Sequence, residues 1–282
     1  MRQMQPVDAP AAWKPYAGRP ARQWPGLLGA WCMATWRRVI MTSSIAVAVL
    51  VQACRPATWR RTVRAELVRN CVQVALYGLP SIIITGLLVG LVMVNQVLYW
   101  LPRAGQEGLI GEFLVLVLVR GIVPVLVGMI VIGRSGSMMM VELGAMRVRG
   151  QVHLLDAQGI DPFLYLVIPR VLATAIGMFC LSMVFLVVAL ITGLVAANTF
   201  GLTSLTFLDF FEEVLTAMGA REHALLLLKT LTSGFAIGLI SCTTGLLAIG
   251  RTVSEVSALL PGGFVRAVLA TLLIFSAFTI LL

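Results

Sequence analysis

The segment Val171–Leu208, VLATAIGMFCLSMVFLVVALITGLVAANTFGLTSLTFL, contains no charged residue. A second uncharged segment, Asn70–Pro102, lies upstream of it. Each is longer than the roughly 20 residues that a helix needs to cross a bilayer. The 282-residue chain is 59 % hydrophobic and only 12 % charged, whereas soluble domains carry about 25 % charged residues. The sequence therefore predicts an all-α, polytopic membrane protein.

The charge is concentrated at the N-terminus. Residues 1–70 contain 11 lysines and arginines against two acids, whereas residues 71–282 contain ten of each. Basic flanks of membrane segments stay on the cytoplasmic side and attract anionic headgroups. We favour this interpretation over nucleic-acid binding, and it places the N-terminus in the cytoplasm.

The chain divides into three expected parts. Residues 1–23, with four prolines and scattered basic residues, are expected to be a disordered basic arm. Residues 24–73 are expected to form an interfacial or re-entrant elbow helix, because its apolar part, Val39–Cys54, is short for a span and is flanked by arginines on both sides. Residues 74–282 form the predicted membrane domain. Its five spans are expected at about residues 74–100, 109–133, 163–200, 224–250 and 264–282, which places the C-terminus outside.

A polar stretch at about residues 138–158 separates spans two and three. Its apolar residues recur at steps of three and four, which is typical of one face of a helix; they are Val141, Ala145, Val148, Val152 and Leu155. We expect an amphipathic helix at the cytoplasmic surface. It rests on lipid and on its own spans, or it docks a soluble partner. The candidate docking residues are Glu142, Met146, Arg147, Arg149, Gln151, His153, Asp156 and Asp161.

Catalytic and metal-binding patterns are weak. Gly133–Gly136 fits the Gly-x-Ser-Gly of intramembrane serine proteases, but His153 lies about five helical turns away and His223 is expected across the membrane. No Gly-x-x-x-x-Gly-Lys-Ser/Thr sequence that would bind ATP is present. The five cysteines show no metal-ligand spacing. We therefore expect no catalytic residue, no metal site and no cofactor on this chain.

Arg120 is the one charged residue that we predict deep inside a span. Such a charge is costly unless it is paired or hydrated. Its candidate partners are Glu107, Glu112, Asn95 and Gln96, or a carboxylate of another subunit. The alternative is that it faces a wet cavity or reaches a headgroup.

The polar stretch and its flanks resemble the signature of MlaE-type permeases, the membrane subunits of MCE-associated ABC transporters. Weaker similarity reaches upstream through Leu79–Pro80 and downstream to Ala267, so that it covers roughly residues 55–270. The matching residues are Gly133-Arg134-x-Gly136-Ser137, Glu142-Leu143-Gly144-x-Met146-Arg147-Val148, Gln151, Leu155, Gly159-Ile160-Asp161-Pro162 and Tyr165-Leu166-Val167-x-Pro169-Arg170.

This resemblance implies an interfacial helix, five spans and a coupling helix between spans two and three. It also implies a dimer of permeases, cytoplasmic ATPase subunits that carry ATP and Mg²⁺, and a periplasmic ring of MCE domains. The implied substrate is lipid, usually phospholipid, and the implied location is the bacterial inner membrane. Spans one and five would then enclose a lipid cavity in the dimer interior. We expect its wall on span one to be Leu87, Leu91, Val94, Asn95 and Leu98.

The sequence departs from the family pattern in three places. The usual Arg-Glu-Leu-Gly-Pro of span two reads Arg120–Pro124, RGIVP, and lacks the acid. The usual Glu-Gln-Ile-Asp of the coupling helix reads Gly150–His153, GQVH, and the loop before the last span reads Leu259–Gly263, LLPGG. The chain would therefore be a divergent homodimer subunit or one half of a heterodimer.

Two other functions compete with a lipid permease. One is a non-transporting scaffold that anchors an ATPase or an MCE assembly. The other is a secondary transporter, which normally needs several ionisable residues inside its spans. Copurification of an ATPase separates the first two from the third, and lipid-stimulated ATP turnover separates the permease from the scaffold.

Overall fold

The computed structural model describes residues 40–55, 61–105, 110–159, 161–200, 210, 212, 214–216, 218–247 and 253–281. The predicted basic arm, residues 1–23, and the first part of the predicted elbow helix lie outside these residues. So does Glu107, one of the candidate partners of Arg120. The chain divides into a unit of residues 1–44 and a unit of residues 45–282, and the second contains every membrane span.

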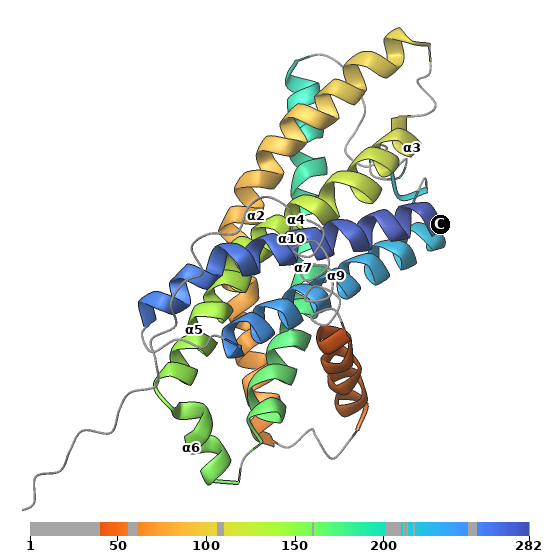
Figure 1. Cartoon of the computed structure of the whole chain (residues 1–282). Helices are drawn as coiled ribbons and strands as arrows, with labels where there is room; N and C mark the ends of the chain where they lie inside the picture. The colour runs from red at the N-terminus through yellow and green to blue at the C-terminus, as the bar shows by residue number, and fades with distance from the viewer. Residues whose placement is uncertain are drawn as a thin grey trace, which may run out of the picture. The chain divides into compact units, whose positions relative to one another are not determined.

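All regular structure in the described residues is helical (Figure 1). A short apolar helix, Ile40–Cys54, comes first. The elements that follow are α2 (Arg61–Arg103), α3 (Ile110–Leu114), η3 (Val115–Ile122), α4 (Val123–Val131), η4 (Ile132–Gly136), α5 (Ser137–Val148), α6 (Gln151–Ala157), η5 (Phe163–Val167), α7 (Ile168–Thr199), α9 (Ala220–Leu246) and α10 (Val253–Leu281).

Five of the described helices are long and apolar enough to cross a membrane, which confirms the predicted class. Two boundaries differ from the prediction. The first spanning helix, α2, begins at Arg61, inside the predicted elbow segment, and its 43 residues extend about 65 Å at 1.5 Å per residue. The second runs without interruption over Glu112–Val148, so that the start of the predicted coupling helix is the end of span two.

The predicted coupling helix, residues 138–158, is two helices. Gly150 has a φ of 73° and separates α5 from α6. Glycine adopts this left-handed conformation without the steric cost that a side chain incurs. The predicted apolar stripe is only partly buried, whereas α5 buries Met139, Met140, Leu143 and Gly144. The expected single amphipathic helix is therefore wrong in its length and in its buried face.

Helices α2 and α7 run parallel and pack closely along their length (Figure 1). Glycines lie where the two helices approach: a Cβ added at Gly90 would overlap the backbone of Ala189, and one added at Gly193 would overlap Val94. Lipid chains are as apolar as leucine, so helices in a membrane associate through close packing of small residues. The Gly86-x-x-x-Gly90 motif of span one thus faces α7.

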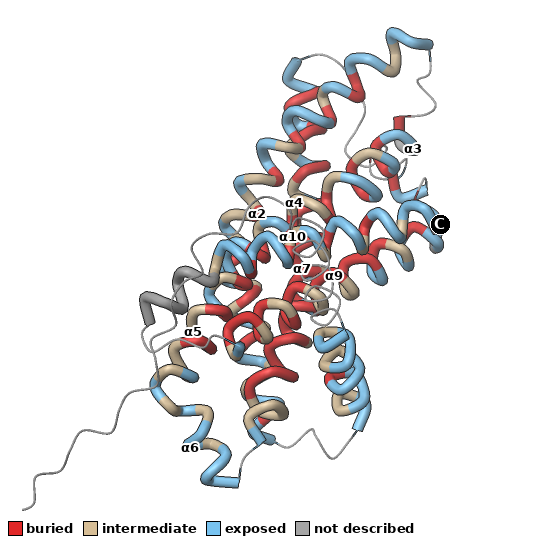
Figure 2. The backbone as a smooth tube through the Cα atoms, viewed as in Figure 1, coloured by how far each residue is buried: buried red, intermediate tan, exposed pale blue. Residues whose placement is uncertain are grey.

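Close packing at glycines also holds α9 and α10 against the other helices. Gly234 and Gly238 of α9 face the backbone of α7, whereas Gly245 of α9 and Gly263 of α10 face Met140 of α5. Figure 2 shows the buried residues gathered where these helices cross. The C-terminal part of span two, α5, is therefore held between two later spans.

Gly90→Ala tests the packing of α2 on α7. The added methyl group would collide with the Ala189 backbone, and such overpacking costs about 1–3 kcal/mol. We expect a lower melting temperature in detergent. Gly262→Ala is the control, because its nearest non-local atom is the end of Arg266 at 3.7 Å. Equal melting temperatures for the two variants would contradict the packing described.

Candidate functional site

Two of the predicted docking residues are engaged inside the chain. Glu142 of α5 forms an ion pair with Arg170 of α7, with 3.1 Å between Oε1 and Nη2. The Arg147 guanidinium donates a hydrogen bond to the carbonyl oxygen of Leu246, the last residue of α9. The side chains of α5 thus tie it to the ends of two other spans.

Arg170 is almost fully buried. Its residue is 2 % exposed, and its Nε and Nη1 atoms have no hydrogen-bond partner among the described residues. A buried charge is costly unless it is paired, so the single carboxylate of Glu142 carries most of the compensation. From the sequence, Arg170 was named within the family signature and was assigned no partner.

The polar side chains around α6 are free of such ties. Arg149, Gln151, His153 and Asp156 are all exposed, and the apolar Leu154 is 60 % exposed beside them. The remaining two predicted docking residues have internal roles. Met146 packs on a core cluster with Leu143, and the Asp161 carboxylate accepts a hydrogen bond from the backbone N–H of Phe163 at 2.9 Å.

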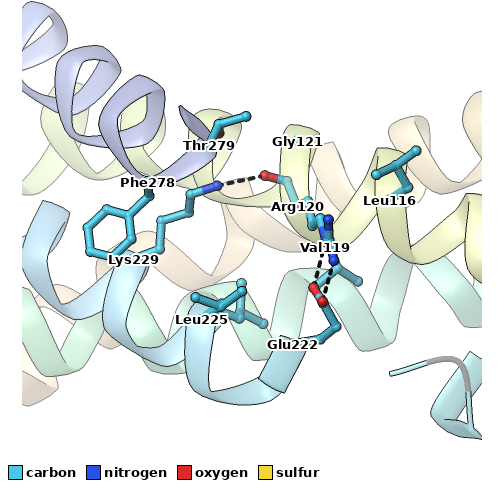
Figure 3. A pocket seen from close by; sticks show the side chains of 10 residues that line it. Leu116, Val119, Arg120, Gly121, Glu222, Leu225, Lys229, Phe278 and Thr279 are labelled. Atoms are coloured by element: carbon cyan, nitrogen blue, oxygen red, sulfur yellow. Dashed lines mark hydrogen bonds and ion pairs between the residues drawn. The ribbon is translucent and has the colours of Figure 1, made fainter. Parts of the chain in front are cut away.

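Arg120 has an acidic partner inside the chain, but it is none of the predicted candidates. Its guanidinium binds both carboxylate oxygens of Glu222, with 2.7 Å between Nε and Oε2 (Figure 3). Glu222 lies in the first turn of α9, which starts at Ala220 and so takes in a residue assigned to the outer loop. The carboxylate missing from span two is therefore replaced by one on span four.

Lys229 completes the cluster, and we had not predicted it. It lies in α9 two turns after Glu222, is 8 % exposed, and its Nζ donates to the carbonyl oxygen of Arg120 at 3.1 Å. This carbonyl lacks its usual helical donor because the residue four positions later, Pro124, has no N–H. The π-helical turn η3 ends just before that proline. The statement that only Arg120 lies deep in a span was thus wrong.

The Arg120–Glu222–Lys229 cluster opens on a pocket of about 230 Å³. Apolar side chains of α9 and α10, among them Leu225 and Phe278, form the rest of its lining (Figure 3). Two cations and one anion leave a net charge of +1 at its edge. The Arg120 side chain is 47 % exposed, so it is accessible while it is paired.

The predicted apolar wall on span one is only partly available. Leu87 and Leu91 are 42 % and 43 % exposed and Asn95 is half-buried. Val94 and Leu98 belong instead to the core and are at most 2 % exposed. They cannot line a cavity outside this chain, because they face α7. Near Leu91 and Asn95 a hollow of about 510 Å³ continues to Gln96, Tyr99, Trp100 and Phe200.

These features define a multi-pass helical membrane protein whose charges are paired across its spans. Over residues 67–281 the sequence matches the family described as permease MlaE. The chain belongs to the MlaE permease family.

Individual relatives agree with this membership. A probable ABC transporter permease protein of Rickettsia prowazekii is 32 % identical over 180 residues, which cover 64 % of this chain and 68 % of the relative. The chloroplastic protein trigalactosyldiacylglycerol 1 of Arabidopsis thaliana is 29 % identical over 193 residues, or 68 % and 53 % of the two chains. The intermembrane phospholipid transport system permease protein MlaE of Haemophilus influenzae is 30 % identical over 142 residues, or 50 % and 54 %.

Arg120→Leu tests the cluster. It leaves Glu222 without its guanidinium partner in a mostly apolar setting, and losing a hydrogen bond to a charged group costs on the order of 1.5–3 kcal/mol. We expect a lower melting temperature, with partial recovery in Arg120→Leu/Glu222→Leu. Glu212→Gln, an exposed acid outside the cluster, is the control. If the double variant is no more stable than Arg120→Leu, the two residues are not coupled.

Proposed function

We propose that the chain is the transmembrane subunit of an ABC transporter that moves phospholipid between the bacterial inner membrane and a periplasmic ring of MCE domains. The N-terminus lies in the cytoplasm and the C-terminus in the periplasm. Family membership and the name of the Haemophilus relative, an intermembrane phospholipid transport permease, support this proposal. The observation that carries it is the exposed apolar wall of α2, which adjoins a hollow with amide and aromatic groups at its outer end.

The wall suits an amphipathic lipid. Leu87 and Leu91 offer apolar surface for acyl chains, and Asn95 lies one turn beyond Leu91. The Asn95 amide donates to the Leu91 carbonyl at 2.5 Å, whereas its Oδ1 has no partner among the described residues. Sites for small ligands are mostly apolar with a few polar groups that fix orientation. That oxygen is buried within the single chain, so the exposed polar residues that line the hollow at this end include Gln96 and Trp100.

The cavity is completed by a second permease, either another copy of this chain or a related subunit. Among the described elements α10 packs mainly on α9, α5 and α4 and does not cover the wall on α2. The Glu222 carboxylate removes one argument for a heterodimer, because Arg120 needs no acid from another subunit.

The energy comes from a separate cytoplasmic ATPase that binds ATP and Mg²⁺. This chain has no P-loop sequence and needs no cofactor or nucleic acid of its own. Since Glu142 and Arg147 are used internally, we assign ATPase docking to the exposed face of α6, with His153, Leu154 and Asp156 at its centre. The coupling region thus stays between spans two and three, as the family resemblance implies. Its proposed contact residues lie on α6, in the C-terminal half of the predicted coupling helix.

The test of the whole proposal is lipid-stimulated ATP turnover. The chain is coexpressed with its ATPase and purified, and ATP hydrolysis is measured with and without phospholipid, alongside a lipid-resolved mass spectrum of the complex. Copurified phospholipid together with stimulated turnover supports a permease. An assembled complex whose turnover does not respond to any lipid would indicate the scaffold instead.

The assignment of docking to α6 predicts a separation of effects. Leu154→Asp with His153→Ala should reduce ATPase copurification at least tenfold, because an exposed apolar contact is lost, and should leave the melting temperature of the isolated chain unchanged. Glu142→Ala should lower that melting temperature, because it strands the buried Arg170 charge. If the α6 variant still binds ATPase and Glu142→Ala alone releases it, docking resides on α5.

The wall predicts where lipid is found. A photo-crosslinking residue at Leu91 should capture phospholipid in the assembled complex, and Leu91→Trp should block transport without unfolding the chain. Ile176, which is 44 % exposed on α7, is the matched position for the crosslinker. Stronger capture at Ile176 than at Leu91 would contradict the location of the cavity.

A further inference from the structure

Three cationic groups inside the described spans have an acidic neighbour. Arg120 pairs with Glu222, Arg170 pairs with Glu142, and Lys229 lies beside the first of these pairs. Arg134 of η4 differs, because neither ion pair in the described part of the chain involves it. Its Nη1 donates to the hydroxyl of Ser81 on α2 at 2.6 Å, and the residue is exposed.

Two measurements along the helices place Arg134 at the level of a headgroup. Its partner Ser81 is 19 residues before Trp100, which is about 28 Å along α2. The pair Tyr99–Trp100 is typical of the opposite membrane interface, and the hydrocarbon core is about 30 Å thick. On span two, 22 residues separate Glu112 from Arg134, or about 33 Å. Both helices therefore bring this guanidinium to the interface on the α6 side.

Arg134 borders a groove of about 200 Å³ between α2 and the η4–α5 segment. Tyr77 and Gln73 of α2 line it, one and two turns before Ser81, and Met138 of α5 lines it as well. Tyr77 is 56 % exposed, and the Gln73 amide has only the weak acceptor Met138 Sδ at 3.4 Å. The polar lining is thus rich in donors: a guanidinium with unused N–H groups, a phenol and an amide.

We infer that this groove binds the phosphate of one phospholipid in the leaflet on the α6 side. Phosphate oxygens only accept hydrogen bonds, and arginine binds them with short, charge-assisted bonds. The acyl chains would run toward the bilayer centre along Ile84 and Leu88 of α2, which are 59 % and 61 % exposed. The lipid supplies a counter-charge that no ion pair in the described part of this chain provides. The inference goes beyond the proposed function, because it requires neither transport nor an ATPase.

Crosslinking at two neighbouring positions tests the site. Tyr77 is replaced by benzoylphenylalanine, and Leu76, 64 % exposed at almost the same depth, is the matched position. The full-length chain is reconstituted in nanodiscs with equal amounts of phosphatidylglycerol and monogalactosyldiacylglycerol of the same acyl chains. We expect Tyr77 to capture the phosphate lipid about tenfold more than the glycolipid, a ratio that corresponds to about 1.4 kcal/mol. Leu76 should show a ratio near one.

Substitution of the arginine completes the test. Arg134→Gln should bring the ratio at Tyr77 near to that at Leu76, whereas Arg134→Lys should keep part of the preference and Ser81→Ala all of it. Millimolar inorganic phosphate should not compete, because it lacks the acyl chains. Equal ratios at the two positions in the parent chain would overturn the inference, whatever the stability of the variants. An unchanged ratio in a folded Arg134→Gln variant would also overturn it. Failure of lipid-stimulated ATP turnover would leave it standing.

Discussion

Hydrogen-bonding groups inside a membrane span must find their partners in protein, since hydrocarbon offers none. Pro124 creates such a demand, because it leaves the Arg120 carbonyl without its helical donor. Lys229 meets this demand from α9, and Glu222 on the same helix neutralises the Arg120 side chain. The carbonyl that the proline leaves free is thus satisfied by a lysine on another span. The two cations, Arg120 and Lys229, share Glu222 as a neighbouring acid. The relative position of spans two and four follows from this chain of requirements.

Polar side chains also hold the C-terminal end of span two. Arg170 is buried at the start of α7 and depends on Glu142, while Arg147 occupies a free carbonyl at the end of α9. Glu142 of α5 accepts from α7, and Arg147 of α5 donates to α9. These two interactions bind α5 to the bundle. In α6, by contrast, the described polar side chains make no such tie and are exposed. Gly150 thus separates the part of this segment that is bound to the bundle from the proposed docking helix.

Hydropathy was sufficient to predict the five spans, because a long uncharged apolar segment has few other stable structures in a cell. The periodicity of the coupling stretch was less informative. The pattern of Val141, Val148 and Leu155 continues through Gly150, and a helical period contains no information about a single residue with positive φ. Likewise Val94 and Leu98 share a helical side with Leu91, and only the course of α7 determines which of them is buried.

The missing acid of span two shows where sequence reasoning stops. Candidates for the partner of Arg120 were sought just before it in the chain, on span one and in another subunit, but Glu222 lies 102 residues away on span four. The sequence places Glu222 just before the predicted fourth span and Lys229 within that span. Neither could be connected to Arg120 without knowing that α9 packs near η3. The proline in the RGIVP segment was the one local signal, since it implied a carbonyl in need of a donor.

The Lys229–Arg120 bond has a mechanical meaning. A backbone hydrogen bond within a helix cannot open without disturbing the turn that it closes. Here a side chain from another span replaces it, so this one link can break and form again while both helices stay wound. Span two is therefore held at this turn by a hydrogen bond from span four, so the packing of α9 beside η3 contributes to the stability of the helix next to Pro124.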